Sequence, residues 1–111
     1  MVDDKQRRAR TESLFRDVNE RIAESAHRFD AQDTQFVCEC ADANCTHRLA
    51  ASLHEYEQVR SDGATFMIAE GHEHDDIERV VKRGRRFNVV EKMHGTVRAT
   101  VQRLNPRANP V

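Results

Sequence analysis

The chain has 111 residues, the length of one small domain. Hydrophobic residues make up 38% of it and charged residues 33%, which is enough apolar content for one small core. The net charge of −1 argues against a general polyanion-binding protein. Because no apolar run approaches the roughly 20 residues needed to cross a bilayer, we expect no membrane partner.

The three cysteines and the N-terminal sequence together indicate the cellular compartment of the protein. No apolar region follows the opening "MVDDKQRRAR", so the sequence predicts no secretory signal. An odd number of cysteines without an export signal indicates reduced thiols rather than a disulfide framework. We therefore expect a cytoplasmic protein.

The first predicted element is a helix. Residues 1–10 are predicted to form a flexible polar arm. From Thr11, apolar residues recur at intervals of three or four and predict an amphipathic helix of about 18 residues. Its apolar stripe is expected to pack on the core, with a homodimer interface as the alternative, so a monomer and a homodimer both remain open. The stripe consists of Leu14, Phe15, Val18, Ile22, Ala26 and Phe29.

The middle of the chain alternates short strands with a second helix. Residues 35–38 and 46–51 are predicted strands on either side of the cysteine loop. Ser52 and Glu55 match a capping box, which predicts a helix that ends near Ser61-Asp62-Gly63. The run "TFMIA", residues 65–69, predicts another strand.

The last third predicts two more helices and a strand. Asp75 and Asp76 are expected to begin a third helix that Gly84 ends, because its acidic-to-basic charge order complements a helix dipole. Residues 86–93 predict a strand, and a final helix begins at Gly95. The sum is an α+β fold with a small antiparallel sheet and about four helices. We expect residues 11–105 to form one zinc-binding domain and residues 106–111 a tail.

The strongest chemical signal is Cys38-x-Cys40-x4-Cys45. A tight loop can bring three thiolates to one point, and zinc prefers four sulfur or nitrogen ligands in a tetrahedron. Asp42 and Asn44 are turn-forming residues that suit such a loop. Buried structural cysteines and a redox-active pair of thiols are alternative interpretations of this pattern. An iron–sulfur site is a further alternative, but the absence of a fourth cysteine argues against it.

One further ligand would close the site, and six histidines are candidates. His72 follows Gly71 at a predicted turn, from which a side chain can point back at a neighbouring loop. His74 and His47 remain alternatives. His27 and His54 lie in predicted helices, and His94 is far along the chain. The predicted Zn²⁺ ligands are Cys38, Cys40, Cys45 and His72.

Two resemblances bear on this loop. The spacing of its cysteines resembles the post-SET zinc motif of lysine methyltransferases, but nothing else in the chain resembles their catalytic domain. Over most of its length the chain is similar to a group of short, uncharacterised bacterial proteins of actinobacterial type, through "FVCECADANC", "LHEYEQVR", "FMIAEGHE" and "FNVVEK". That resemblance implies that His72 pairs with the cysteines, and it implies no activity.

Two other motifs suggest different functions. His72-x-His74-x-Asp76 is similar to the metal motif of metallo-β-lactamase-fold hydrolases, although Ile77 stands where their next histidine is expected. A basic cluster could contact the phosphates of a nucleic acid. It comprises Arg79, Lys82, Arg83, Arg85 and Arg86.

A closed set of four zinc ligands leaves no position for a catalytic water. The sequence therefore predicts a structural zinc site in a regulatory module that binds a protein partner, rather than an enzyme. A zinc-dependent nucleic-acid-binding regulator is the alternative, and a metal-assisted hydrolase is a third hypothesis.

Overall fold

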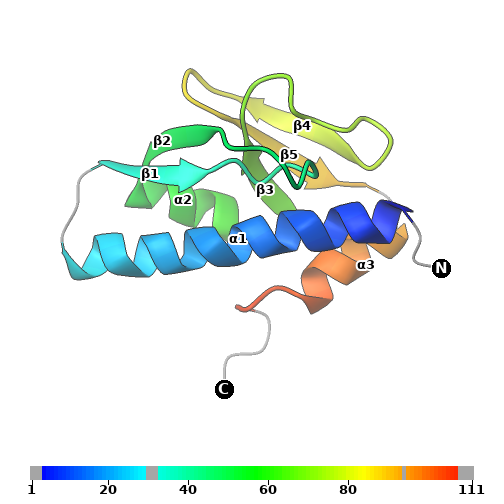
Figure 1. Cartoon of the computed structure of the whole chain (residues 1–111), viewed down its shortest axis with the longest axis horizontal. Coiled ribbons are helices and arrows are strands. Elements are labelled where there is room, and N and C mark those ends of the chain that lie inside the picture. The colour runs from blue at the N-terminus through cyan, green and yellow to red at the C-terminus, as the bar shows by residue number, and fades with distance from the viewer. Residues whose placement is uncertain (1–3, 30–32, 94, 108–111) are drawn as a thin grey trace.

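Two small antiparallel sheets lie against one long helix in the computed structural model, which describes residues 4–29, 33–93 and 95–107 (Figure 1). Within these residues there are three helices and five strands. The α+β class is confirmed, but there are two sheets instead of one and no fourth helix in this part of the chain. The elements are α1 (Asp4–Arg28), β1 (Asp33–Val37), β2 (Arg48–Ser52), α2 (Leu53–Arg60), β3 (Thr65–Ile68), β4 (Glu78–Arg83), β5 (Asn88–Lys92) and α3 (Gly95–Arg103).

The first sheet pairs β1 with β2, and the second has the order β3-β5-β4. In the first sheet Phe36 lies opposite Leu49, and in the second Met67 lies opposite Val89. The ring of Phe36 stacks on that of Tyr56 in α2, with centroids 4.6 Å apart. This contact fixes α2 against the first sheet, while α1 packs against β1 on one side and α3 on the other.

The capping box that begins α2 is confirmed. Ser52 Oγ accepts a hydrogen bond from the Glu55 backbone amide at 3.1 Å, and Glu55 Oε1 accepts one from the Ser52 amide at 2.9 Å. Both backbone donors would otherwise be unpaired at the start of the helix. The predicted end is also correct, since α2 stops at Arg60.

The predicted third helix is wrong, because this segment contains strand β4 (Glu78–Arg83) instead. Glu78 and Arg79 alternate between a buried and an exposed side chain, as residues in a strand do. Glu78 lies directly opposite Lys92 of β5, and a bulge shifts the pairing between Val80 and Lys82. A partner strand and a buried countercharge therefore outweigh the local charge order that favoured a helix.

The start of α1 also differs from the prediction, since the helix begins at Asp4 and includes most of the expected polar arm. Residues 1–3 of that arm lie outside the described residues. Ala9 is fully buried, and Arg8 forms two hydrogen bonds to Asp76, at 3.0 and 2.7 Å. These contacts hold the first turns of α1 against the segment before β4. No helix in the described ranges has an apolar stretch long enough to cross a membrane.

The apolar stripe predicted for α1 is buried only in part: Ala26 is buried and Ile22 packs against the core. Leu14 is 63% exposed and Phe29 75% exposed, so the prediction that the stripe packs on the core is wrong for these residues. The helix instead buries a mixed face of polar and small side chains. That face comprises Ala9, Glu12, Ser13, Arg16, Asn19, Ala23 and Ala26.

A buried ion triad lies between α1 and the second sheet. Lys92 Nζ contacts the carboxylates of both Glu12 and Glu78, and all three side chains are fully buried. The ammonium also lies 5.0 Å from the centroid of the Phe66 ring, a favourable cation–π position. Burial raises the pKa of Glu12 well above its ordinary value, although the Lys92 charge opposes that rise. A protonated Glu12 would leave the triad neutral.

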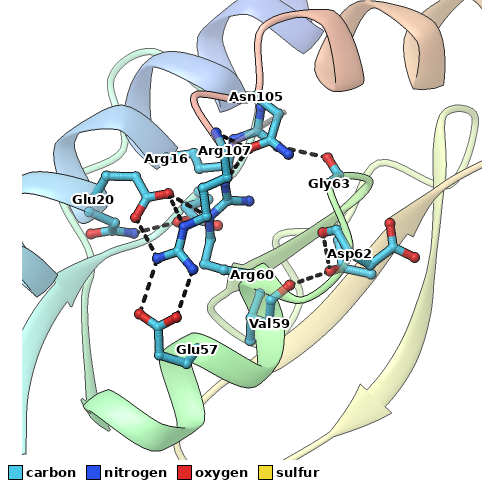
Figure 2. A network of polar contacts seen from close by, with 12 residues as sticks. Arg16, Glu20, Glu57, Val59, Arg60, Asp62, Gly63, Asn105 and Arg107 are labelled. Carbon is cyan, nitrogen blue, oxygen red and sulfur yellow. Dashed lines mark hydrogen bonds and ion pairs between the residues drawn. The ribbon is translucent and has the colours of Figure 1, made fainter. Parts of the chain in front are cut away.

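A second polar network joins α1, α2 and the segment after α3 (Figure 2). Arg107 donates hydrogen bonds to Glu20 at 2.7 and 2.8 Å and to Glu57 at 2.6 and 3.0 Å. Arg16 donates to the carbonyl oxygens of Gly63 and Val101 at 2.8 and 2.7 Å. The first part of the predicted tail is thus anchored at Arg107, and residues 108–111 lie outside the described ranges.

We predict that two substitutions in the ion triad destabilise the protein to very different degrees. Lys92→Met leaves two buried carboxyls without a cation and should lower the free energy of unfolding by about 3–5 kcal/mol. Glu12→Gln should lower the free energy of unfolding much less, since burial already favours the neutral form of the Glu12 carboxyl. Denaturant titrations of both variants would measure the difference.

The same triad predicts a pH dependence. A carboxyl whose pKa is higher in the folded than in the unfolded state stabilises the fold fully below its unfolded pKa, and this stabilisation is lost as the pH rises through the folded pKa. Wild-type stability should therefore fall with rising pH in that window, and Glu12→Gln should reduce the decline. Equal destabilisation by both substitutions at pH 6 would contradict a neutral Glu12.

Candidate metal centre

The cysteine loop begins where β1 ends. The Cys38 amide donates to the carbonyl oxygen of His47 at 3.1 Å, which continues the β1–β2 pairing by one residue. Asp42 then closes a tight turn, because its carbonyl oxygen accepts from the Cys45 amide at 3.0 Å and its side chain accepts from the Asn44 amide at 2.9 Å. This turn brings Cys45 back towards the end of β1, as expected from the turn-forming residues.

A second turn presents His72 to the loop. The His72 amide donates to the Ala69 carbonyl oxygen at 3.1 Å, and Gly71, the third residue of this turn, has a φ of +83°. Such a turn favours glycine at that position because other residues are strained there. The Ala69 amide also donates to Cys38 Sγ at 3.2 Å, so the residue that follows β3 contacts the loop directly.

The four predicted ligand residues converge. The sulfur atoms of Cys38, Cys40 and Cys45 and one ring nitrogen of His72 all lie within 4.8 Å of one another. His72 Nδ1 is 3.5 Å from Cys38 Sγ and 3.7 Å from Cys45 Sγ. Ligands of a tetrahedral zinc lie about 3.6 Å apart for sulfur and nitrogen and about 3.8 Å apart for two sulfurs. The cluster therefore has the dimensions of a metal site, and none of the three cysteines forms a disulfide.

The two alternative histidines lie outside this cluster. His74 Nδ1 is 3.4 Å from a guanidinium nitrogen of Arg8, and Arg8 also binds Asp76. A cation between His74 and Asp76 is incompatible with a hydrolase-type metal pair at these two residues. The ring of His47 packs on that of His72, with centroids 4.6 Å apart, but His47 is exposed. His94 lies outside the described residues.

The three thiols of the cluster differ in pKa. The Cys38 thiol donates a hydrogen bond to the Cys40 sulfur, which lowers the pKa of Cys40 to about 5 and raises the pKa of Cys38. Burial raises the pKa of Cys45. Of the three thiols, Cys40 is therefore the one that loses its proton most readily. A divalent cation would bind three thiolates by displacing the remaining thiol protons.

Glu39, between two of the cysteines, points into the core instead of towards the cluster. Its carboxylate accepts hydrogen bonds from Asn19 Nδ2 at 2.7 Å and from the Met67 amide at 2.9 Å. The Glu39 amide donates in turn to the Met67 carbonyl oxygen at 2.8 Å. Burial raises the pKa of Glu39 to about 7, and the bond from Asn19 opposes this rise.

Asn19 connects this carboxylate to β1. Its side-chain amide forms two hydrogen bonds with the backbone of Val37. Asn19 Nδ2 donates to the Val37 carbonyl oxygen at 2.8 Å, and Asn19 Oδ1 accepts from the Val37 amide at 2.8 Å. Sequence reasoning did not identify Asn19 or Glu39 as residues that position the loop. The available signal was the alternation of residues in an extended chain, which places Glu39 on the side opposite Cys38 and Cys40.

The predicted basic cluster lies on β4 and the turn that follows, not on a helix. Arg79 pairs with Glu91 at 3.2 Å, and Arg86 pairs with Glu55 and with Asp33. The other three cations have no carboxylate within ion-pair distance among the described residues. They are Lys82, Arg83 and Arg85.

Comparison with known proteins gives no relative from which a function could be transferred. No family model matches the chain, and no significant match is found among curated proteins or solved structures. The chemistry of the chain's own residues therefore carries the functional argument.

We predict that Asn19→Ala destabilises the protein by about 2–4 kcal/mol, because it removes the partners of a buried carboxylate and of two backbone groups. Asn44→Ala is the matched control, since Asn44 is exposed in the cysteine loop. The control should change stability by no more than about 0.5 kcal/mol. Chemical denaturation of both variants would measure the effect, and an Asn19→Ala variant as stable as the control would exclude the proposed role of Asn19.

Proposed function

We propose that Cys38, Cys40, Cys45 and His72 bind one Zn²⁺ ion as a structural site, in a module that acts by binding a protein partner. The observation that carries this proposal is the convergence of four ligand atoms within 4.8 Å, drawn from two separate turns. Three sulfurs and one imidazole nitrogen are a common ligand set for structural zinc. A harder cation such as Mg²⁺ or Ca²⁺ would require oxygen ligands instead.

The position of the cluster supports a structural role. Cys38 and Cys40 are buried, and Cys45 and His72 are half-buried. The loop connects β1 and β2 of the first sheet, whereas His72 follows β3 of the second sheet, so an ion at this point would connect the two sheets. Because a preformed site rarely exists in an unfolded chain, the free energy of metal binding would add to the free energy of folding.

The same ligand set supports binding rather than catalysis. Four protein ligands complete the tetrahedral coordination of zinc and leave no position for water or substrate. The residues of the hydrolase-like motif are engaged elsewhere, as His74 and Asp76 both contact Arg8. We therefore propose a regulatory function in which the zinc maintains a surface that a partner protein recognises.

Three histidine variants test the metal site. Purified wild-type protein should bind one zinc ion by native mass spectrometry and elemental analysis. His72→Ala should weaken zinc binding by more than the 10–100-fold that loss of an outer-shell residue typically costs. His74→Ala and His47→Ala should retain one zinc, because neither imidazole belongs to the cluster.

Removal of the metal tests its structural role. A chelator, or replacement of all three cysteines by serine, should abolish cooperative unfolding or lower its midpoint sharply. A triple serine variant that stays folded with unchanged stability would refute a structural metal. Zinc retained by His72→Ala but lost from His47→Ala or His74→Ala would refute the ligand assignment.

A further inference from the structure

A groove runs between α2 and the β4–β5 hairpin, on the face of the second sheet that α1 does not cover. It consists of two adjoining hollows of about 200 and 290 Å³, which share Glu55, Lys82 and Phe87 in their walls. The larger hollow lies at the hairpin turn, and the smaller one extends along α2. Since β4 is at the edge of its sheet, no further strand covers the hairpin side of the groove in the described part of the chain.

The floor of this groove is apolar. Val59 of α2 and Val89 of β5 line the smaller hollow together with Phe87, which is half-buried. Val81 of β4 lines it as well and is 46% exposed. The bulge between Val80 and Lys82 allows two successive β4 residues, Val81 and Lys82, to face the same groove. Val59 and Val89 are buried at the bottom of the hollow, so Val81 and Phe87 provide its accessible apolar surface. An apolar hollow flanked by polar groups can seat one apolar side chain of a partner.

The smaller hollow is lined by one cation, Lys82, and by two carboxylates, Glu55 and Asp62. The Ser52 amide and, more weakly, the charges of Arg86 and Lys82 lower the pKa of Glu55. The rim is basic at the larger hollow, where Arg85 and Arg86 join Lys82 and Glu55. Lys82 and Arg85 line it, and neither has a carboxylate partner among the described residues. The acidic side chains nearby are already engaged, because Glu55 binds Arg86 and the Ser52 amide, and Asp62 accepts from the Ala64 amide. A ligand that supplied carboxylates could therefore pair with Lys82 and Arg85, which form no ion pair among the described residues.

We propose that this groove binds an acidic peptide segment of a partner protein, with one large apolar side chain of that segment seated in the hollow formed by Val59, Val81 and Phe87. This assignment rests on the proposed function as a protein-binding module, but it does not depend on the metal. Carboxylates next to the apolar anchor, on the side of the β4–β5 hairpin, pair with Lys82 and Arg85. The apolar contact supplies affinity, and the charges supply specificity and a salt-dependent association rate.

The groove favours a peptide over a nucleic acid. Proteins that bind single strands stack bases on exposed aromatic rings, whereas Phe87 is half-buried here and Tyr56 is completely buried. An apolar hollow gives no advantage to a phosphate backbone, which seeks cations and backbone amides. The net charge of −1 also opposes general polyanion binding.

A randomised twelve-residue peptide library displayed on phage tests this proposal with zinc-loaded protein. Panning should enrich peptides that carry one large apolar residue next to aspartates and glutamates. An enriched peptide, made synthetically, should bind about tenfold more weakly to Val81→Glu and to Lys82→Glu, and its affinity should fall as salt is raised. Leu14→Glu is the control, because Leu14 is also an exposed apolar residue but lies on α1 and does not line the groove, and it should leave the affinity unchanged.

Several results would overturn the assignment. These are no enrichment over the Val81→Glu variant, enrichment of peptides without acidic residues, and equal binding to wild-type and Lys82→Glu protein. A single-stranded DNA or RNA oligonucleotide that displaces the peptide and binds more tightly would show that the groove serves nucleic acid. Zinc content and unfolding midpoint, measured on every variant, distinguish failure of this groove from failure of the metal site.

Discussion

The structure depends on a single buried carboxylate. Glu39 lies between two cysteines of the loop, yet its side chain bonds to Asn19 of α1 and to the backbone of Met67 in β3. Through these contacts it connects the long helix, the first sheet and the second sheet at one point. Removing a carboxylate from water is costly unless its oxygens find donors, so this position fixes the elements that provide them. The same contacts orient Cys38 and Cys40 towards His72.

Polar interactions carry much of the interior because the chain is poor in large apolar residues. The face that α1 buries contains Glu12, Arg16 and Asn19, each of which finds partners on other elements. Such pairs contribute little net stability when compared with apolar packing, but breaking one partner is expensive. These pairs therefore determine how the helices and strands are arranged more than they stabilise the fold. A metal bound by the cysteine cluster would supply stability that this core provides only sparingly.

Local signals were read correctly from the sequence where they determine the structure. The capping box at Ser52 and Glu55 is of this kind, because its two partners lie three residues apart. A tight turn likewise brings the three cysteines together, although the fourth member of the cluster, His72, lies 27 residues beyond Cys45. The position of His72 was also predicted, since Gly71 allows the turn that presents it. The hydrophobic pattern of α1 pointed to the wrong face, because its buried side chains are charged or small. The small residues Ala9, Ser13 and Ala23 were the better signal, together with Ala26, the one buried residue of the predicted stripe.

The segment from Glu78 to Arg83 shows why other parts of the structure could not be predicted from the sequence. Its charge order suits a helix, and only the distant partner β5, with Lys92 opposite Glu78, favours a strand. The role of Asn19 likewise depends on contacts 18 and 20 residues along the chain. Interactions of this kind follow from the tertiary arrangement and leave no periodic trace in a single sequence.

The central claim is that three cysteines and His72 enclose one metal ion. X-ray absorption spectroscopy at the zinc edge of the metal-loaded protein tests it most directly. The account predicts three sulfur ligands at about 2.3 Å and one nitrogen at about 2.0–2.1 Å, with no water. A shell dominated by oxygen and nitrogen, or a fifth ligand from solvent, would contradict it.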